Sequence, residues 1–536
     1  MTKTRGYLGI DAGTQGLSVI FTDEEMRIRA AGAGAYDMVP GLAAGCYEQE
    51  PTDWEAALAA AMADLRGKLA AKGVEMDVLA IGISGQMHGE VLADAAGKPL
   101  GPARLWCDGR NEAEGHELTA RLGVKCPKRL TAARWLWTIR NRPELAARVA
   151  RITTPAGWIA HLLTGDWLLG IGDAAGMFPI DQRSLDYDAR LLADFDAFVA
   201  AQPGGPRVRP LGELLPQVRC AGADGGTLDA RGAALLGLPQ GIPLAAAEGD
   251  QPAALAGSLI GDAGQVSMSF GTSVVANAVG DRPFQGIAGA IDHFCAPDGK
   301  PINMVFLRNG TTAMNAVVEM FGRALPAGVD PAAAFAAVMP QVLAAPDDCD
   351  GIAALPFLDD EPGIGVSRGG TAALIGLDGT NATPGNAAKA MLLATIFNLR
   401  MGSDLLDAQG FPRTEIILSG GLTKTPGLGQ ILADAFHTPV VLLDGAAEGT
   451  AWGAALMAKF RAEALAGKAT PWPAFLQRHA TGVPTRFAPR PQAAAALDRA
   501  FARHKRLVAI QGQLDSAIHG DRERHPPAPA GGFQIT

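Results

Sequence analysis

The sequence predicts an α/β protein of two large domains, and three observations support this prediction. The chain has 536 residues, which is more than one hydrophobic core usually serves. Strand-like and helix-like stretches alternate along its first 250 residues, as they do in α/β domains. A glycine-rich turn between two strand-like runs also occurs twice, at residues 7–21 and at residues 265–277. The repeated turn indicates that two lobes share one design.

Each of the two turns joins a pair of apolar, β-rich runs through a Gly-Thr step, which predicts a hairpin with backbone N–H groups exposed at its tip. Such a tip can hold phosphate. The first turn also carries Asp11, an acid of the kind that a metal–nucleotide complex needs, whereas the second carries the hydroxyls of Thr272 and Ser273. The asymmetry predicts one metal-side loop and one phosphate-side loop. Taken singly, each turn leaves open that its glycines serve only the backbone conformation.

Further elements follow in chain order from the spacing of apolar residues. An amphipathic helix is expected between Pro51 and Gly73, a buried strand at residues 78–84 and a short strand at residues 243–247. In the second half, a helix is expected at residues 386–406, and a strand at residues 415–421 ends in a double glycine.

Changes in this pattern divide the chain into three parts. We predict a first domain at residues 1–253 and a second at residues 254–490. The last part, residues 491–536, should hold a helix followed by a loose tail rich in proline and glycine.

Composition and charge exclude several classes of protein. Hydrophobic residues make up 48% of the chain and charged residues 19%, as in an ordinary globular protein rather than a disordered one. The net charge of −9 argues against a nucleic-acid surface. No apolar run reaches the length of a membrane span, and the N-terminus has no signal-like apolar stretch. The six scattered cysteines contain no Cys-x-x-Cys pair, so we expect reduced thiols and a cytoplasmic protein. From the charge and the apolar runs, we expect it to bind neither nucleic acid nor membrane.

Two widespread nucleotide-binding motifs are missing from the sequence. Each Gly-Lys pair is followed by the wrong residues for a Walker-type phosphate loop, and the Gly-x-Gly segments lack the third glycine of a dinucleotide fingerprint. A bound nucleotide is therefore expected between the two duplicated lobes.

Six short segments also carry a family resemblance. They are Gly-Ile-Asp-Ala-Gly-Thr-Gln at 9–15, Gly-Ile-Ser-Gly-Gln-Met-His-Gly at 82–89, Leu-Trp-Cys-Asp-Gly-Arg at 105–110, Glu-Gly-Asp-Gln-Pro-Ala at 248–253, Ser-Phe-Gly-Thr-Ser at 269–273 and Ser-Gly-Gly at 419–421. In order and spacing they resemble the FGGY carbohydrate kinases, and the second and third segments look most like those of xylulokinases, which phosphorylate D-xylulose at O5 with ATP. The resemblance implies two actin-like, ribonuclease-H-like domains with sugar and ATP in the cleft between them.

Residue chemistry allows roles to be assigned in such a cleft. Phosphoryl transfer to a hydroxyl needs a base, donors and Mg²⁺ for the phosphate charge, and exclusion of water. Asp250 is our candidate for the base, because it follows an apolar run and Gly249 and is flanked by small residues. The alternative is that Asp250 caps a helix that begins at Gln251-Pro252, since proline favours the first helical turn, and one residue can serve both purposes.

The other ligand contacts fall into two sets. Asp11 is expected to contact Mg²⁺ directly or through water, and the ATP contacts are expected at Thr14, Gln15, Gly271, Thr272, Gly420 and Gly421. The sugar hydroxyls are expected to meet Gln86, His88, Asp108 and Gln251, with Met87 over a carbon face. For His88 a purely structural role, and for the double glycine a simple strand-ending turn, stay open.

Three departures from the family pattern keep the substrate open. Xylulokinases usually have asparagine where this chain has Gln251, which is more like glycerol kinases, and the family's Lys-x-x-Trp appears as Arg-Trp-Leu-Trp at residues 134–137. The usual Ser-Gly-Glu-Arg is Asp-Asp-Glu-Pro at residues 359–362, with Asp359, Asp360 and Glu361. D-xylulose is the first expectation, and another ketose or polyol, such as ribulose, glycerol or an erythritol-like compound, is the alternative. A non-catalytic actin-like ATP-binding protein is a third possibility that the cleft carboxylate Asp250 argues against, and a homodimer is left open.

Overall fold

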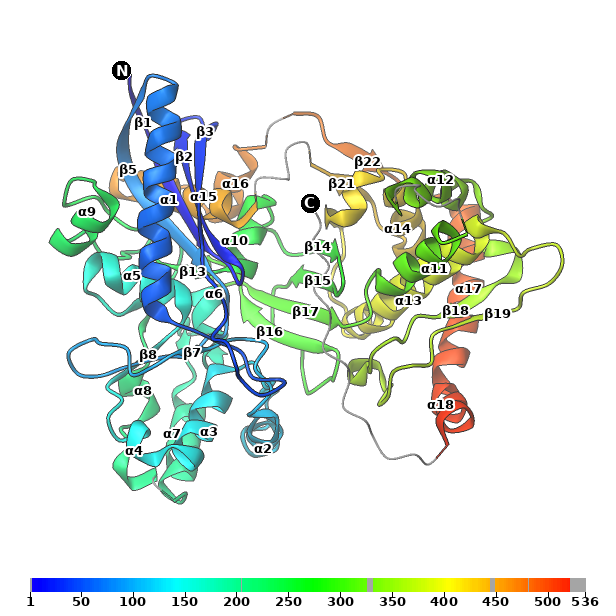
Figure 1. Ribbon diagram of the computed structural model, residues 1–536, viewed down its shortest axis with the longest axis horizontal. Coiled ribbons are helices and arrows are strands. Elements are labelled where there is room, and N and C mark those ends of the chain that lie inside the picture. The colour runs from blue at the N-terminus through cyan, green and yellow to red at the C-terminus, as the bar shows by residue number, and fades with distance from the viewer. Residues whose placement is uncertain (1, 204, 325–330, 444–448, 481, 521–536) are drawn as a thin grey trace.

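The computed structural model describes residues 2–203, 205–324, 331–443, 449–480 and 482–520, which form two lobes (Figure 1). The first lobe is built mainly from the N-terminal half of the chain, coloured blue to teal, and the second from the green, yellow and red parts. Each lobe contains one mixed β-sheet with helices packed against it.

The two sheets repeat one strand order. The first runs β13 (Glu248–Gly249), β5 (Val74–Gly85), β1 (Thr2–Ala12), β2 (Gly16–Asp23), β3 (Ile28–Ala35). The second runs β16 (Ile291–Cys295), β17 (Pro301–Leu307), β15 (Val274–Val279), β14 (Gln265–Phe270), β20 (Glu415–Gly420), β21 (Val440–Leu442), β22 (Thr485–Phe487). Both contain three antiparallel strands followed by two parallel ones, which are β5 and β13 beside β1 and β20 and β21 beside β14. The antiparallel strands β16 and β22 extend the second sheet at its two ends. The predicted duplication and both predicted hairpins are confirmed.

Helices from distant parts of the chain cover the two faces of the first sheet. Helix α1 (Pro51–Ala71) packs on one face, where a Cβ at Gly34 would lie 2.1 Å from the carbonyl oxygen of Ala57. Helix α15 (Gly449–Leu465) packs on the opposite face, where a Cβ at Gly82 would lie 1.8 Å from the carbonyl oxygen of Ala454. Only glycine allows these approaches. Figure 1 shows α15 and the following α16 (Trp472–Gln477) in the first lobe, so the chain returns there after building most of the second.

The rest of the first lobe is inserted between β5 and β13. Its helices are α2 (Glu112–Leu122), α3 (Thr131–Asn141), α4 (Pro143–Ala146), α5 (Pro155–Thr164), α6 (Ile171–Ala174), α7 (Ala189–Ala200), α8 (Leu211–Leu214) and α9 (Ala230–Leu236). Its short strand pairs are β6 (Val91–Ala93) with β8 (Arg151–Thr153), β9 (Leu168–Gly170) with β12 (Gln217–Arg219), and β10 (Ile180–Asp181) with β11 (Asp186–Tyr187). Its strand β7 (Ala103–Arg104) pairs with β4 (Glu48–Gln49), which precedes α1 in the chain.

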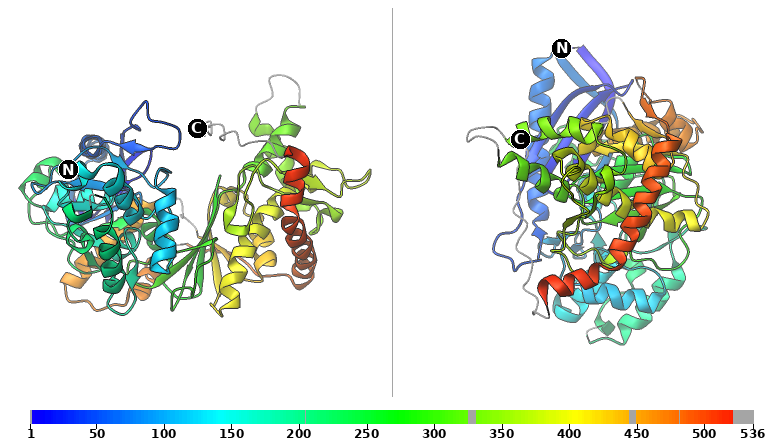
Figure 2. Two further views of the ribbon diagram at one scale, coloured as in Figure 1. Left: turned by 90° about the horizontal axis from the view of Figure 1, so that it is seen from below. Right: turned by 90° about the vertical axis from the view of Figure 1, so that its right-hand side faces the viewer.

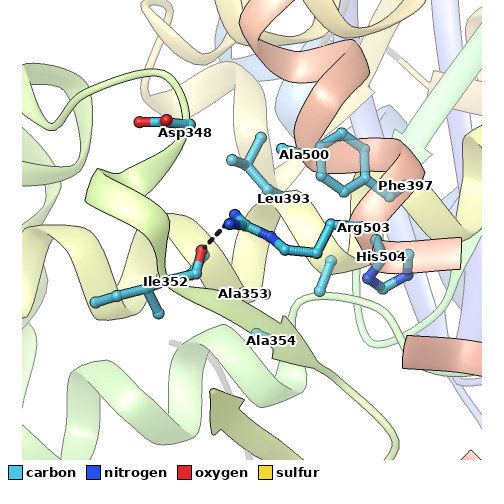
Figure 3. A pocket seen from close by; sticks show the side chains of 11 residues that line it. Asp348, Ile352, Ala353, Ala354, Leu393, Phe397, Ala500, Arg503 and His504 are labelled. Atoms are coloured by element: carbon cyan, nitrogen blue, oxygen red, sulfur yellow. Dashed lines mark hydrogen bonds between the residues drawn. The ribbon is translucent and has the colours of Figure 1, made fainter. Parts of the chain in front are cut away.

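The second sheet packs against α13 (Pro384–Ala408), whose neighbours are α11 (Thr312–Gly322), α12 (Pro331–Ala344) and α14 (Leu428–Phe436). The C-terminal helix α17 (Pro491–Ala509) lies across α13 and β18 (Ala353–Leu355), which pairs with β19 (Ala373–Ile375), and is followed by α18 (Gln511–His519). A small hollow of about 10 Å³ lies at this junction. Beside it Arg503 donates to the carbonyl oxygen of Ile352, at 3.4 Å (Figure 3). A helix is present after residue 490 as expected, but its Leu497 and Phe501 pack in the core of the second lobe. The predicted tail lies within residues 521–536, which are outside the described residues.

One predicted strand is wrong. The apolar run at 243–247 is extended, but it makes only isolated bridges, from Leu244 to Ile81 and from Pro243 to Thr227. Proline has no N–H to donate to a ladder, and the strand proper is the two-residue β13 that follows. The helices expected at 51–73 and 386–406 and the strand expected at 415–421 correspond to α1, α13 and β20.

The two lobes meet in a small apolar core next to helix α10 (Asp250–Gly257). Leu255 and Ile260 of this connection pack with Val279 and Ile417 of the second sheet. The lobes diverge from this core, as Figure 2 shows in its left view. Two hollows of about 360 and 470 Å³ are lined by residues of both lobes, so a cleft lies between them.

Candidate active site

Two carboxylates lie at the edge of the first sheet where its parallel strands end. Asp11 is the penultimate residue of β1, and its two oxygens accept hydrogen bonds from the hydroxyls of Ser84 (2.7 Å) and Thr450. Asp250 begins α10 directly after β13. Ligands of open α/β sheets bind beyond the carboxyl ends of the strands, so this edge is a candidate site on topology alone.

The surroundings of Asp250 make it an unusually strong base for a carboxylate. Burial raises its pKa to about 7, and the charge of Asp11 contributes to the rise. Backbone N–H groups of Gln251 and Met87 hydrogen-bond to the carboxylate and oppose this effect. A group with a pKa near 7 is partly ionised at neutral pH and can accept a proton from an attacking hydroxyl. Helix α10 begins at Asp250 itself, with Gly249 as its N-cap and no side-chain cap bond, so the helix-capping interpretation of Asp250 is wrong.

The first hairpin turn brings Thr14 beside the loop that follows β5. The hydroxyl of Thr14 donates to the Oε1 atom of Gln86 at 3.3 Å and accepts from the indole nitrogen of Trp106 at 3.2 Å. Gln15 is exposed at the tip of the turn. Trp106 is 40% exposed and lines the larger of the two hollows, so it forms part of the cleft wall.

The second hairpin turn exposes Gly271 and Thr272, and a neighbouring loop holds it from behind. The N–H of Gly310 donates to the carbonyl of Thr272 at 2.8 Å, and the N–H of Thr311 donates to that of Gly271 at 2.8 Å. Residue 310 must be glycine, because a Cβ there would lie 2.2 Å from the carbonyl oxygen of Gly271.

The double glycine lies next to this second turn. Gly420 ends β20 in register with Phe270, the residue before Gly271, and Gly421 begins the next short helical turn. Gly420 has φ 76° and ψ −158°, a conformation that favours glycine, and it is exposed. The nucleotide segments predicted in the second domain are therefore together at one edge of its sheet.

The loop after β5 is fixed by its own side chains. Gln86 is buried, and its amide donates to Gln49 at 2.8 Å, while Met87 packs into the apolar core between the lobes. His88 lies beside the 360 Å³ hollow with its Nδ1 atom 3.1 Å from the carbonyl oxygen of Gly176. Burial, together with the charges of two nearby arginines, holds the pKa of His88 well below its usual range. The ring is neutral, so Nδ1–H donates to Gly176 and Nε2 is left as an acceptor.

Two predicted sugar contacts have protein partners of their own. The carboxylate of Asp108 is fully buried and accepts hydrogen bonds from Arg110 and from the N–H of Tyr47 at 2.9 Å. Burial alone would raise the pKa of Asp108, but these bonds hold it below its ordinary value. Gln251 accepts a hydrogen bond from Asn277 of β15 at 3.2 Å and so connects the start of α10 to the second lobe.

The cleft is also bridged at its wall by charges from both lobes. Asp292 of β16 forms ion pairs with Lys125, at 2.8 Å, and with Arg129. These residues line both hollows, and burial, with the nearby charge of Arg129, lowers the pKa of Lys125 to about 7. The lobes are thus in direct contact across the cleft.

Comparisons with known proteins agree with this arrangement. Residues 6–257 match the N-terminal domain of the FGGY family of carbohydrate kinases, and residues 266–462 match the C-terminal domain. The chain belongs to the FGGY family of carbohydrate kinases.

Relatives and solved structures place this FGGY kinase more closely. It is 28% identical over 468 residues to the xylulose kinase of Haemophilus influenzae, covering 84% of this chain and 90% of the relative. It is also 28% identical over 472 residues to the xylulose kinase of Escherichia coli K12, covering 85% and 90%. The structure of xylulose kinase from Rhodospirillum rubrum matches with a TM-score of 0.79 at 23% identity, covering 95% of this chain and 99% of that one. The structure of Plasmodium falciparum glycerol kinase with ADP matches with a TM-score of 0.76 at 20% identity. The match covers 94% of this chain and 98% of that one.

The fold expected from the resemblance, two actin-like, ribonuclease-H-like domains with a cleft between them, is confirmed by these matches. The predicted bounds at 253 and 490 remain a proposal, and α15, although late in the chain, packs on the first sheet. No helix within the described ranges is long and apolar enough to cross a membrane.

The unusual Asp-Asp-Glu-Pro segment of this kinase supports the second turn. Glu361 is buried and accepts hydrogen bonds from the N–H groups of Arg308 (2.8 Å) and Asn309 (2.9 Å), and the Asn309 amide donates to the Asp359 carbonyl at 3.0 Å. The segment therefore fixes the loop whose next residue, Gly310, holds the exposed second turn.

Sequence reasoning missed several residues of the site. They are Ser84, Thr450, Gln49, Trp106, Glu361 and the bridging residues Lys125, Arg129 and Asp292. Trp106 lies within a segment that carried the resemblance, which was a usable signal. Thr450 is separated from Asp11 by 439 positions, and nothing local marks their contact.

Proposed function

We propose that this carbohydrate kinase transfers the γ-phosphoryl group of ATP to a hydroxyl of a small sugar, with D-xylulose as the first candidate and D-xylulose 5-phosphate as its product. The observation that carries the proposal is Asp250, a partly buried base with a raised pKa, placed between the sugar loop and the second lobe. The names of the relatives, which are xylulose kinases, support the choice of sugar.

On the sugar side, Asp250 accepts the proton of the attacking hydroxyl as its oxygen forms a bond to the γ-phosphorus. The bond from that phosphorus to the bridging oxygen of ADP breaks at the same time, and ADP leaves. The free Nε2 of His88 accepts a hydrogen bond from another sugar hydroxyl, and Gln251 donates through its amide. Loss of the base should cost about 10² to 10⁴ in rate.

On the nucleotide side, the exposed turn residues Gly271 and Thr272, with the Thr272 hydroxyl, face the phosphates, and Gly420 and Gly421 let the adenine approach the backbone. Thr14 and Gln15 complete the phosphate contacts from the first lobe. Each lobe then supplies part of one phosphate site.

Mg²⁺ fits these residues as a companion of ATP. No cluster of three or more His, Cys, Asp or Glu side chains suited to a metal was found in the described part of the chain. A nucleotide-bound Mg²⁺ needs only one or two carboxylates besides phosphate and water oxygens. Asp11, oriented by Ser84 and Thr450, would hold it directly or through water. When bound, the ion neutralises charge on the phosphates.

A second candidate substrate is another ketose or a polyol. Gln251 in place of asparagine favours it, and so does the structural match to a glycerol kinase. The sugar-binding wall thus differs from the xylulokinase pattern beside the base itself.

A coupled assay of ADP release with Mg²⁺-ATP and a panel of pentuloses, hexuloses and polyols tests both candidates. We expect D-xylulose to give the highest kcat/KM. A preference of more than about tenfold for ribulose, a tetritol, glycerol or a hexulose would refute xylulose and leave the kinase assignment intact, since one factor of ten is about 1.4 kcal/mol of transition-state binding. Absence of ADP release with every sugar would favour the non-catalytic alternative.

A further inference from the structure

One buried arginine holds three loops of the cleft wall. Arg134 lies on α3 and has no exposed surface. Its guanidinium donates to the carbonyl oxygens of His88 (2.7 Å), Leu105 (2.6 Å) and Arg129. These three carbonyls belong to three different loops.

Each of the three loops presents a side chain to the cleft. His88 is the proposed sugar contact, and Leu105 precedes Trp106, whose indole bonds to Thr14 of the first turn. Arg129 lines both hollows and pairs with Asp292 of the second lobe. One guanidinium therefore sets the relative positions of the sugar loop, the tryptophan and the bridge between the lobes.

The electrostatics of Arg134 indicate a role beyond packing. Burial lowers its pKa to about 10, so it stays charged at neutral pH. The acids that act on it, Glu90 and Asp108, are each in contact with another arginine, Arg104 or Arg110. A buried cation whose direct partners are carbonyls is costly, and an apolar residue would fill a core position at lower cost.

The bond to His88 also acts on a strained residue. His88 has φ 65°, in the left-handed region that non-glycine residues rarely adopt. The carbonyl of His88 accepts from Arg134 and from the hydroxyl of Thr131 at 3.3 Å, and these bonds hold the conformation. The ring can then donate to Gly176 and keep Nε2 available.

We propose that Arg134 is a positioning residue for sugar binding: it does not contact the substrate, but it fixes His88, Trp106 and Arg129 in the arrangement that receives the sugar. The inference rests on the proposed function, because it takes the sugar to lie at His88.

The test uses the full-length kinase with Arg134→Met, Arg134→Lys and a matched control on the same helix. The control is Arg140→Met, because Arg140 is partly exposed and pairs with Glu117 and Gln202, away from the cleft. We expect Arg134→Met to raise the sugar KM by about tenfold or more, as loss of a supporting contact behind a ligand does. The ATP KM and kcat should change much less.

Arg134→Lys should give an intermediate sugar KM, because an ammonium group keeps the charge but lacks the planar fork that reaches three carbonyls. Arg140→Met should leave the sugar KM unchanged. A soluble Arg134→Met with a lower melting temperature and an unchanged sugar KM would overturn the proposal, since it would show a role in stability alone. If Arg134→Met does not fold, Arg134→Lys decides: a sugar KM raised severalfold supports the proposal, and a wild-type value overturns it. Failure of the proposed function is distinct, because the wild-type protein would then phosphorylate no sugar.

Discussion

The turn between β1 and β2 and the turn between β14 and β15 occupy equivalent places in two sheets of the same order, yet they are held differently. Side chains hold the first turn: the hydroxyl of Tyr36 donates to the carbonyls of Gly13 and Gly16, and the Gln49 amide donates to that of Thr14 at 2.7 Å. Backbone N–H groups of the loop at 310–311 hold the second.

The chemistry at the two turns differs as well. The first lies beside the carboxylates Asp11 and Asp250, whereas the second exposes Gly271 and Thr272 next to Gly420. Carboxylates can bind a cation and accept a proton, whereas N–H groups and hydroxyls can donate hydrogen bonds to phosphate. Under the proposed function, the duplicated fold divides one reaction, with proton acceptance on one side and phosphate binding on the other.

The largest effect should come from removing the base on the first side. Asp250→Asn should lower kcat by at least about two orders of magnitude, because the amide cannot accept the proton. Far-UV circular dichroism and sugar binding by fluorescence should match the wild type. The control is Asp64→Asn, which removes a partly exposed acid on α1. Turnover of Asp250→Asn close to that of the control would reject Asp250 as the base.

The pH profile tests the same carboxylate. Because the pKa of Asp250 is raised to about 7, the protonated, inactive form accumulates as pH falls. We expect kcat/KM for the sugar to fall about tenfold per pH unit well below pH 7 and to level off above it. The kcat/KM of Asp250→Asn should not show this fall below pH 7. A wild-type profile that stays flat down to about pH 5 would mean that the base has an ordinary carboxylate pKa.

A substitution behind the second turn should affect the nucleotide and spare the sugar. Gly310→Ala places a Cβ 2.2 Å from the Gly271 carbonyl oxygen and must displace the turn. We expect the ATP KM to rise by about tenfold, since misplacement of a binding group by about 1 Å can cost even more. Gly379→Ala is the control, because a Cβ there meets nothing within 4 Å. Equal ATP KM values for the two variants would contradict the phosphate role of this turn.

The smallest effects should separate the two ways of holding a turn. Tyr36→Phe removes both hydroxyl bonds to the first turn and should lower the free energy of unfolding by about 1 kcal/mol. Thr311→Val removes one hydroxyl bond, at 3.0 Å, to Gly271 but keeps the backbone N–H bond, so it should cost less. Urea unfolding of both variants measures the difference. A larger loss for Thr311→Val would reverse the comparison.

Features with a local signal could be predicted from the sequence. Both hairpins, α1 and α13 follow from apolar periodicity and from glycine and proline placement, and the helix start expected at Gln251 lies one residue after the observed start of α10. The structure also brings Asp11 near Asp250, as expected of two strand ends at one sheet edge.

Contacts between distant segments could not be predicted, because they depend on packing that leaves no local pattern. The bond from Thr450 to Asp11 requires α15 to return to the first sheet, and only glycines such as Gly9 and Gly82 permit that approach. Asp108 was expected at the sugar because it is polar and near a loop, but its ion pair with Arg110 is visible only in the structure. That sugar contact stays a prediction.

The fate of the γ-phosphoryl group tests the central claim most directly. Wild-type protein is incubated with Mg²⁺ and γ-labelled ATP, with and without D-xylulose, and labelled sugar phosphate is separated from labelled inorganic phosphate. If acids in one lobe and N–H groups in the other form one water-excluding site, label should pass mainly to the sugar, and hydrolysis without sugar should be at least about a hundredfold slower. Release of inorganic phosphate at the same rate with and without sugar would contradict the account.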